Sequence, residues 1–228
     1  PKSNFTHFHH WFIALSVTAA LGIIAHHTEE LMYLGYLLMF GGLQLTGYIA
    51  FRRFSIQEYN GLRIVGSVGT IVMLVILSFR PVWDDIRKLS EEGFILFSPE
   101  ALLCIFLATA LIYLNFAKRE ISIEDIPAIA PWVYLVAVII FIIGIWWLDA
   151  YILINVLLLI VAINKIRAGV QLDDLVILNF GMLILALLIA SRFFDSDISF
   201  VIRGILFVLL GAGFFLANYF LLKRRKHA

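Results

Sequence analysis

Charged residues are scarce in this sequence. Asp, Glu, Lys and Arg make up only 14% of the 228 residues, hydrophobic residues make up 62%, and the mean hydropathy is +0.99. A soluble domain is about a quarter charged and about half apolar, because it must cover its core with polar surface. The composition therefore excludes a water-soluble protein and predicts one that lies in the lipid bilayer.

Cysteine is almost absent too. The single Cys104 lies inside an apolar run, which excludes an intramolecular disulfide and argues against a cysteine-based metal site. We interpret it as a small buried hydrophobe. The net charge is +1 and the basic residues are scattered in small groups of up to four, so nucleic acid is not an expected partner.

Signatures of enzymes are missing as well. The sequence has no H-E-x-x-H zinc motif, no nucleophile elbow, no Walker loop and no glycine fingerprint of a dinucleotide fold. Asp and Glu all fall near the borders of apolar runs, whereas a proton-driven carrier usually has an acid near the membrane centre. We therefore expect no cofactor, and an enzyme or a coupled transporter is disfavoured.

What is present is a series of eight apolar runs separated by short polar segments. A membrane-spanning helix needs about 20 mostly apolar residues, so the runs predict an all-α transmembrane bundle that forms a single domain over residues 1–228. The first run is short, but no cleavage signal follows it, and we expect it to be retained. Asp149 alone separates the fifth run from the sixth. The predicted spans are residues 11–25, 31–51, 62–79, 98–116, 132–148, 150–163, 175–191 and 198–222.

The basic residues test this count, because Lys and Arg of short loops collect on the cytoplasmic side of a membrane. With eight spans, twelve of them share the face that holds both termini and four lie on the other face. Seven or nine spans would mix the two sets, so the pattern predicts cytoplasmic N and C termini. The twelve are Lys2, Arg52, Arg53, Arg63, Lys118, Arg119, Lys165, Arg167, Lys223, Arg224, Arg225 and Lys226, and the four are Arg80, Arg87, Lys88 and Arg192.

The longest predicted outer segment runs from Arg80 to Ser98. Its first part, Pro81 to Leu89, has apolar residues at helical spacing and is expected to lie along the outer interface of the membrane. Trp83 is expected to anchor it there, because tryptophan prefers the headgroup region.

Small and amide residues predict how the spans pack. Gly41 with Gly42, and Gly66 with Gly69, mark bends or close crossings of helices, and Gly204 with Gly211 places a small-residue stripe on the last span. Amide side chains within or at the ends of spans are expected to pair across helices or to line a wet cavity. They are Gln44, Asn115, Asn155, Asn179 and Asn218.

Two short stretches of the chain look alike. Ser78 and Arg80 precede Asp84 with aromatic residues between them, and Ser191 and Arg192 precede Asp195 in a similar way. We consider two interpretations, a parallel four-plus-four repeat of the kind found in transporters and a chance similarity of apolar helices.

Arg203 lies about one and a half turns inside the last predicted span, where an unpaired charge costs several kcal/mol. It needs a partner, and Asp149, Asp195 and Asp197 are predicted near the same outer face. Such a pair either holds helices together or binds an anionic group in a cavity. A ligand site would consist of Arg203, Asp195, Asn179 and Arg192.

A second group of candidate residues contains types that bind metals. His26, His27 and Glu30 follow the first span, and His26 and Glu30 are four residues apart, which places them on one helical face if the segment is helical. Capping or solvation of a helix boundary is the alternative interpretation. His7, His9 and His10 precede the span, so they lie on the opposite side of the membrane from this group.

Two regions of the chain carry a likeness to a known family. The first is Leu21-Gly-Ile-Ile-Ala-His-His-Thr-Glu-Glu-Leu31 with Leu43-Gln-Leu45, Tyr48 and Arg52-Arg53, and the second is Asn179-Phe-Gly181, Ser191-Arg-Phe-Phe-Asp195, Phe200, Arg203-Gly204, Phe207 and Gly211. In these regions the chain resembles a bacterial inner-membrane family called domain of unknown function 2157. The resemblance implies a polytopic helical membrane protein and lends no catalytic residues.

Three functions are compatible with these patterns. The leading hypothesis is a non-enzymatic scaffold or accessory component of the bacterial inner membrane, whose partners are the lipid bilayer and either another membrane protein or a second copy of the chain. A transporter of a small solute or ion would use the site near Arg203. A metal-dependent membrane enzyme would use His26, His27 and Glu30.

Overall fold

The computed structural model describes residues 4–24, 30–54, 60–91, 98–116, 130–147 and 149–195, together with isolated residues between 201 and 219. These residues form helices, and none of those described lies in a strand. The all-α class predicted from the sequence is therefore confirmed. The helices are α1 (Asn4–Ile24), α2 (Leu31–Phe54), α3 (Gly61–Leu77), α4 (Arg80–Ile86), α5 (Lys88–Glu91), α6 (Pro99–Phe116), α7 (Ala130–Gly144), α8 (Ala150–Gln171) and α9 (Leu175–Asp195).

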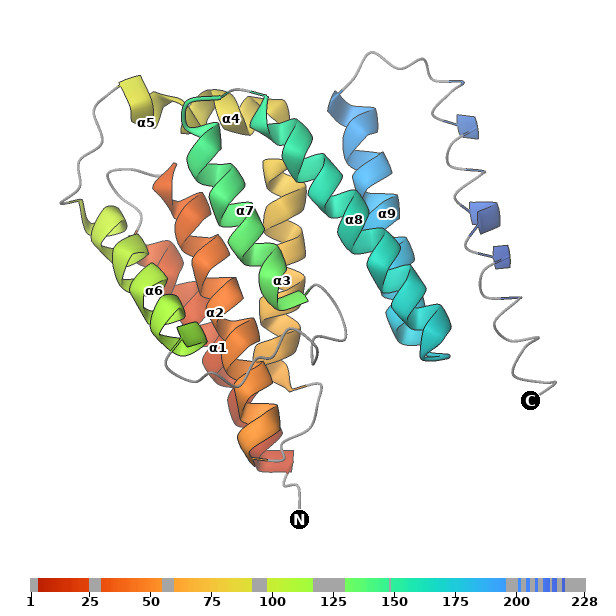
Figure 1. Cartoon of the computed structure of the whole chain (residues 1–228), viewed down its shortest axis with the longest axis horizontal. Coiled ribbons are helices and arrows are strands. Elements are labelled where there is room, and N and C mark those ends of the chain that lie inside the picture. Colours follow the sequence, from red (N-terminus) through yellow and green to blue (C-terminus); the bar gives the residue numbers. More distant parts are fainter. Residues whose placement is uncertain are drawn as a thin grey trace.

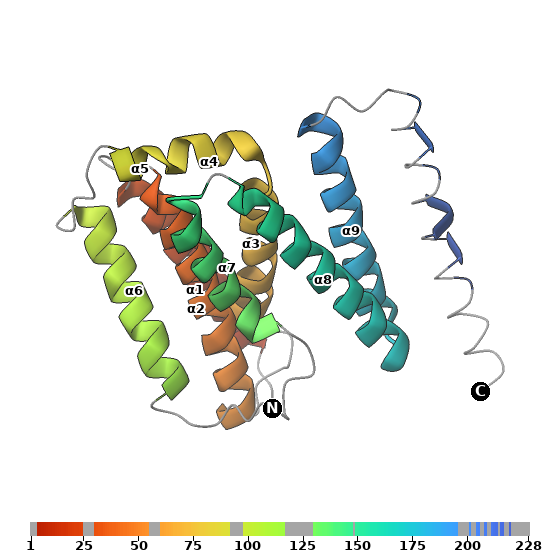
Figure 2. The same ribbon diagram turned by 45° about the horizontal axis from the view of Figure 1, so that its top comes forward.

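The long helices run up and down alternately, and the short helices α4 and α5 lie across one end of the bundle (Figures 1 and 2). We call this end the α4 end. The other end holds the last residues of α2 and α8 and the first residues of α3. We call it the basic end, after Arg52, Arg53, Arg63, Lys165 and Arg167. The two groups of charge that the sequence assigns to opposite faces therefore lie at opposite ends of the helices wherever the structure describes them.

Two helices are long and apolar enough to cross a membrane by themselves, Ala150–Gln171 and Leu175–Arg192. Gly61–Leu77 and Arg80–Ile86 pass the same test only as a pair, and the chain bends by 88° between them. Shorter apolar helices cover Phe8–Leu21, Pro99–Tyr113 and Trp132–Gly144. The described residues thus support a membrane protein, while the count of eight spans stays a prediction.

Several helix bounds differ from the predicted spans. The helix α8 continues to Gln171, beyond the expected end at Ile163, because its buried stripe goes on to Gly169 and because Lys and Arg are good helix formers. Lys165 and Arg167 therefore belong to a helix and not to a loop.

The helix α7 ends earlier than expected, at Gly144 and not at residue 148. The amides of Trp146 and Trp147 both donate to the carbonyl of Ile143, which turns the chain toward α8. The helix α1 begins earlier than expected, at Asn4 and not at Trp11, so the three N-terminal histidines lie within its first turns.

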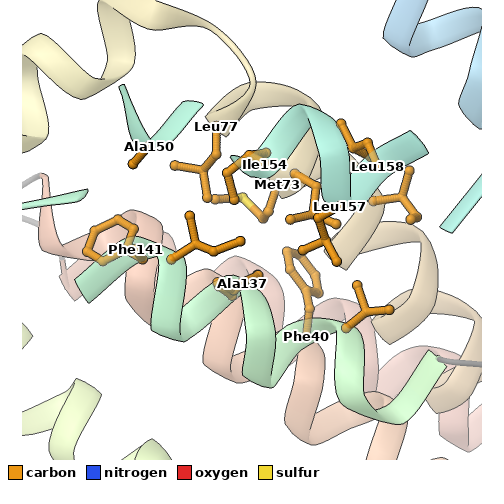
Figure 3. Close-up of a cluster of buried hydrophobic side chains, with 14 of the residues drawn as sticks. Phe40, Met73, Leu77, Ala137, Phe141, Ala150, Ile154, Leu157 and Leu158 are labelled. Atoms are coloured by element: carbon orange, nitrogen blue, oxygen red, sulfur yellow. The ribbon is translucent and has the colours of Figure 1, made fainter. Parts of the chain in front are cut away.

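A core of apolar side chains lies between α2, α3, α7 and α8. Phe40, Met73, Leu77, Phe141 and Ile154 converge there from the four helices (Figure 3). Outward-facing side chains of the bundle are also apolar: Phe106 of α6 is 68% exposed and Val176 of α9 is 77% exposed. A surface of this kind would be costly in water and is suited to hydrocarbon.

Glycines allow the closest helix contacts, as predicted for two of the three groups. A Cβ on Gly66 of α3 would lie 2.4 Å from the backbone nitrogen of Gln44 in α2, and one on Gly69 would lie 2.2 Å from the ring of Phe40. A Cβ on Gly41 would lie 2.5 Å from the ring of Tyr134 in α7. The contact expected of Gly204 and Gly211 is not found, because a Cβ on either glycine would have no described atom within 4 Å.

The segment predicted to lie along the membrane interface does form a helix across the bundle end. In α4, Asp84 and Asp85 are exposed, whereas Trp83 and Ile86 are fully buried. The indole nitrogen of Trp83 donates to the carbonyl of Leu77 at 2.7 Å, and its ring packs 6.1 Å from that of Phe141. Trp83 is therefore a core residue that fixes α4 to the bundle, and the prediction that it anchors this segment in the headgroup region is wrong, because its ring is fully buried.

Candidate functional site at the α3–α4 junction

The bend between α3 and α4 exposes backbone groups that a continuous helix would pair. Ser78 is the C-cap residue of α3, and the amides of Ser78 and Phe79 donate to Val75 and Ile76 at 3.2 Å. Pro81 lies in the first turn of α4 and has no amide hydrogen to donate to the carbonyl of Leu77, which accepts from Nε1 of Trp83 instead. The carbonyl of Ser78 needs partners from elsewhere.

Two side chains from distant helices supply these partners. Arg192 of α9 donates from Nη2 to the carbonyl of Ser78, and Asn155 of α8 donates from Nδ2 to the same carbonyl at 3.3 Å. Asn155 also donates to the carbonyl of Tyr151 at 2.7 Å. The end of α3 thus meets α8 and α9, which lie far from it in the sequence, at one backbone oxygen, and the prediction that Asn155 bonds across helices is confirmed.

The serine hydroxyls at this junction are used locally. Ser78 donates from Oγ to the carbonyl of Val75 at 2.6 Å, and Ser191 donates from Oγ to that of Leu188 at 2.7 Å. The two hydroxyl oxygens lie 3.5 Å apart, and both side chains are buried. Since each hydroxyl hydrogen is directed at a backbone carbonyl, neither serine is arranged as an activated nucleophile.

The electrostatics of the junction favour a cation. The last carbonyls of α3 carry the negative end of the helix dipole, and a positive side chain there is stabilising. The guanidinium of Arg192 occupies this place and also lies 5.9 Å from the centre of the Phe79 ring, in a cation–π contact. The Oδ1 atom of Asn155 is buried and accepts no hydrogen bond from the described residues.

The structure divides the residues that the sequence assigns to one outer site. Arg192 lies at the junction. Asn179 lies thirteen residues earlier on the same helix, which is about 20 Å along its axis. The prediction that Asn179 shares a site with Arg192 and Asp195 is therefore wrong, because α9 is a single continuous helix that carries Asn179 toward the basic end.

The other members of that site are not described at the level of their side chains. Asp195 is the last residue of α9, but its side chain is not among those described, and Arg203 lies outside the described residues. Their pairing stays a prediction. The sequence does not indicate that Ser78, Ser191 and Asn155 lie beside Arg192, although the similar stretches around Ser78 and Ser191 are a signal that points to both serines.

The candidate metal ligands are only partly described. His26 and His27 lie outside the described residues, and Glu30 lies just before α2 with its side chain partly exposed. Among the residues that are described, no group of three or more His, Cys, Asp or Glu could hold a metal ion. A metal site that includes His26 and His27 therefore stays a prediction.

Cys104 lies on the inward side of α6. It is buried, and its thiol is 3.6 Å from the carbonyl of Leu31, to which it donates. Glu100, one turn earlier on α6, is fully buried. The interpretation of Cys104 as a small buried hydrophobe is confirmed, and the structure adds that it packs α6 against α2.

No protein-family model matches the chain, and neither the curated proteins nor the solved structures contain a match.

Proposed function

We propose that this protein is a non-enzymatic component of a bacterial inner membrane, a scaffold or accessory subunit that crosses the bilayer eight times with both ends in the cytoplasm. The observation that carries the proposal is the position of Arg192. The predicted outer site has two cations, Arg192 and Arg203, and Arg192 is the one whose side chain the structure describes. Its guanidinium donates to the carbonyl of Ser78 at the end of α3. A residue held in this way stabilises a helix junction and is a poor choice for binding a solute.

The arrangement of charge supports the proposed threading. Asp84, Asp85 and Asp149 lie at the α4 end, whereas Arg52 and Arg53 end α2 at the basic end. Since basic residues of short loops prefer the cytoplasmic side, the basic end is the cytoplasmic one. The resemblance to domain of unknown function 2157 implies the same general architecture, and we propose membership in that family on the residues named above.

The surface of α6 supports a role in association. Its outward face carries apolar and aromatic residues such as Phe106, which is 68% exposed, and Tyr113, which is 65% exposed. Lipid covers such a face in a monomer, and a second membrane protein covers it in an assembly. An accessory subunit would use faces of this kind.

The experiment is a measurement of assembly in mild detergent. Light scattering on the purified protein gives the mass of the protein part of each particle, and we expect a mass above that of one chain, or a stoichiometric membrane-protein partner. A monomer that carries no partner, both in detergent and after reconstitution into lipid discs, contradicts the proposal.

A transporter is the second candidate, and one observation favours it. The buried Oδ1 of Asn155 beside Arg192 is a polar atom that no described donor satisfies, and a hydrated path would provide water to it. Solute flux into proteoliposomes that is lost in Arg203→Ala supports this candidate. Flux that is the same for Arg203→Ala, or for empty liposomes, refutes it.

A further inference from the structure

Two helix hairpins of the bundle, α2–α3 and α8–α9, are held together by the same kind of reciprocal glycine contact. In the first, a Cβ on Gly47 would lie 2.6 Å from the backbone nitrogen of Arg63, and one on Gly66 would lie 2.4 Å from that of Gln44. In both helices the glycine follows the contacted residue by three positions. Since backbone meets backbone, no side chain between the two helices can change its conformation to let them slide.

The second hairpin repeats this arrangement. A Cβ on Gly169 would lie 2.4 Å from the backbone nitrogen of Leu178, and one on Gly181 would lie 2.7 Å from that of Ile166. The spacing of three positions is the same in α8 and in α9. The equivalence of the two hairpins favours a parallel repeat over a chance similarity of apolar helices.

A short turn closes the second hairpin at the basic end. The carboxylate of Asp174 accepts from the amide of Val176 at 2.8 Å and from that of Ile177 at 3.3 Å. The amide of Asp174 donates to the carbonyl of Gly169 at 2.9 Å. Because the turn and the glycine contacts both join α8 to α9, the two helices form one rigid body.

The links from this rigid body to the preceding helices lie near the α4 end. Asn155 of α8 and Arg192 of α9 both donate to the carbonyl of Ser78, at the end of α3. The covalent connection from α7 reaches α8 at the same end, through a turn in which the amide of Ala150 donates to the carbonyl of Trp147 at 3.2 Å. A polar link and the chain itself thus fasten the hairpin at one end.

The apolar contacts lie beside the junction, and the hairpin diverges from α3 beyond them. Ile154 and Leu157, in the first half of α8, meet Met73 near the end of α3 (Figure 3). Toward the basic end, α8 and α9 lean away from α3 (Figures 1 and 2). There α8 carries Ile163 and Val170, which are 39% and 40% exposed. A rigid body that is fastened at one end and diverges at the other is placed to pivot.

We propose that the α8–α9 hairpin rocks as one rigid body against the α2–α3 hairpin, with the junction at Ser78 as its pivot, so that the bundle opens and closes at the basic end. The end of α8 lies about 24 Å from Asn155, so a rotation of about 10° moves it by about 4 Å. Rocking of one repeat against another is the motion by which transporters expose a site to one side of the membrane. The inference goes beyond the scaffold role and does not rest on it.

The experiment measures distances between pairs of spin labels by double electron–electron resonance, in lipid discs and in a Cys104→Ala background. Phe12→Cys with Val170→Cys forms the pair across the hairpins, since Phe12 is exposed on α1, which packs on α3. Ile152→Cys with Val176→Cys, two exposed positions on α8 and α9, is the matched control within one hairpin. We expect the distance distribution of the first pair to be about twice as wide as that of the control, or to have two maxima.

A third pair tests the pivot. Asp84→Cys on α4 with Ile152→Cys joins the two bodies at the α4 end, and its distribution should be narrow in the otherwise wild-type chain. Arg192→Ala should widen this distribution, whereas Arg80→Ala, which replaces an exposed arginine, should leave it unchanged.

Three results overturn the proposal. A distribution across the hairpins as narrow as that of the control shows that the hairpin does not rock. A control distribution as wide as the first shows that α8 and α9 are not one rigid body. A pivot pair that Arg192→Ala leaves unchanged shows that the junction is not the pivot. The first two comparisons do not need the Arg192 variant to fold, and the mass of the assembly tests the scaffold role separately.

Discussion

Arg192 in the last turn of α9 donates a hydrogen bond to the carbonyl of Ser78, 114 residues earlier in the chain. The bond exists because α3 ends there and the chain turns by 88°, which removes the ordinary helical partner of that carbonyl. It is a bond from a charged donor to the negative end of a helix, the class of hydrogen bond that contributes most to stability. The bend at the end of α3 is therefore stabilised by the last turn of α9.

Replacement of Arg192 tests this dependence. Arg192→Ala should lower the free energy of unfolding by about 2 kcal/mol, because a charge-assisted bond is lost and the buried carbonyl of Ser78 keeps only Asn155. Chemical or thermal unfolding in detergent measures the change. Arg80→Ala is the matched control, since Arg80 is an exposed arginine at the same junction. Equal stability of the two variants contradicts a structural role for Arg192.

Asn155 and Arg192 should act as a coupled pair. Both side chains donate to one carbonyl, so after one donor is lost the carbonyl keeps only the other. The free energy of unfolding lost in the double variant should therefore exceed the sum of the losses in the two single variants by about 0.5–1 kcal/mol. A double-mutant cycle with Asn155→Ala and Arg192→Ala measures this coupling. Strictly additive effects would show that the two side chains do not share the acceptor in the membrane.

The close crossing of α2 and α3 predicts a contrast between two glycines. Gly66→Ala should cost about 1–3 kcal/mol, because its new methyl group would meet the backbone of Gln44, which cannot move aside easily. Gly42→Ala should be tolerated, since its nearest neighbour is a methyl group of Leu111 at 3.5 Å. The measurement is the unfolding midpoint of each variant. A Gly66→Ala protein as stable as Gly42→Ala would show that the helices are not in such close contact.

Much of the fold is readable from the sequence, because lipid as a solvent makes every span a long apolar run. The amphipathic segment at α4 was predictable for a related reason: its alternation of Trp83 and Ile86 with Asp84 and Asp85 has a helical period. The end of α8 was not predictable, since the charge of Lys165 marks a span border in the sequence while its backbone continues the helix. Charge ends the hydrophobic run and leaves the hydrogen-bonded helix intact.

The candidate site shows a different limit. Arg192 was recognised from its charge and Asn155 from its amide, since polar side chains in apolar spans need partners. Their common partner is a backbone carbonyl of Ser78, and a backbone group carries no signal in the sequence. Asn179 and Arg192 share one apolar run and a polar character, but thirteen residues of continuous helix place them at opposite ends of α9.

The central claim is that the chain crosses a membrane with the α4 end outside and both termini inside. Cysteine labelling tests it most directly, in a Cys104→Ala background that carries either Asp149→Cys, in the exposed turn before α8, or Lys223→Cys, after the last predicted span. With a maleimide that cannot cross membranes, the account predicts labelling of Asp149→Cys in intact cells and of Lys223→Cys only after the membrane is opened. Labelling of both positions from the same side would contradict it.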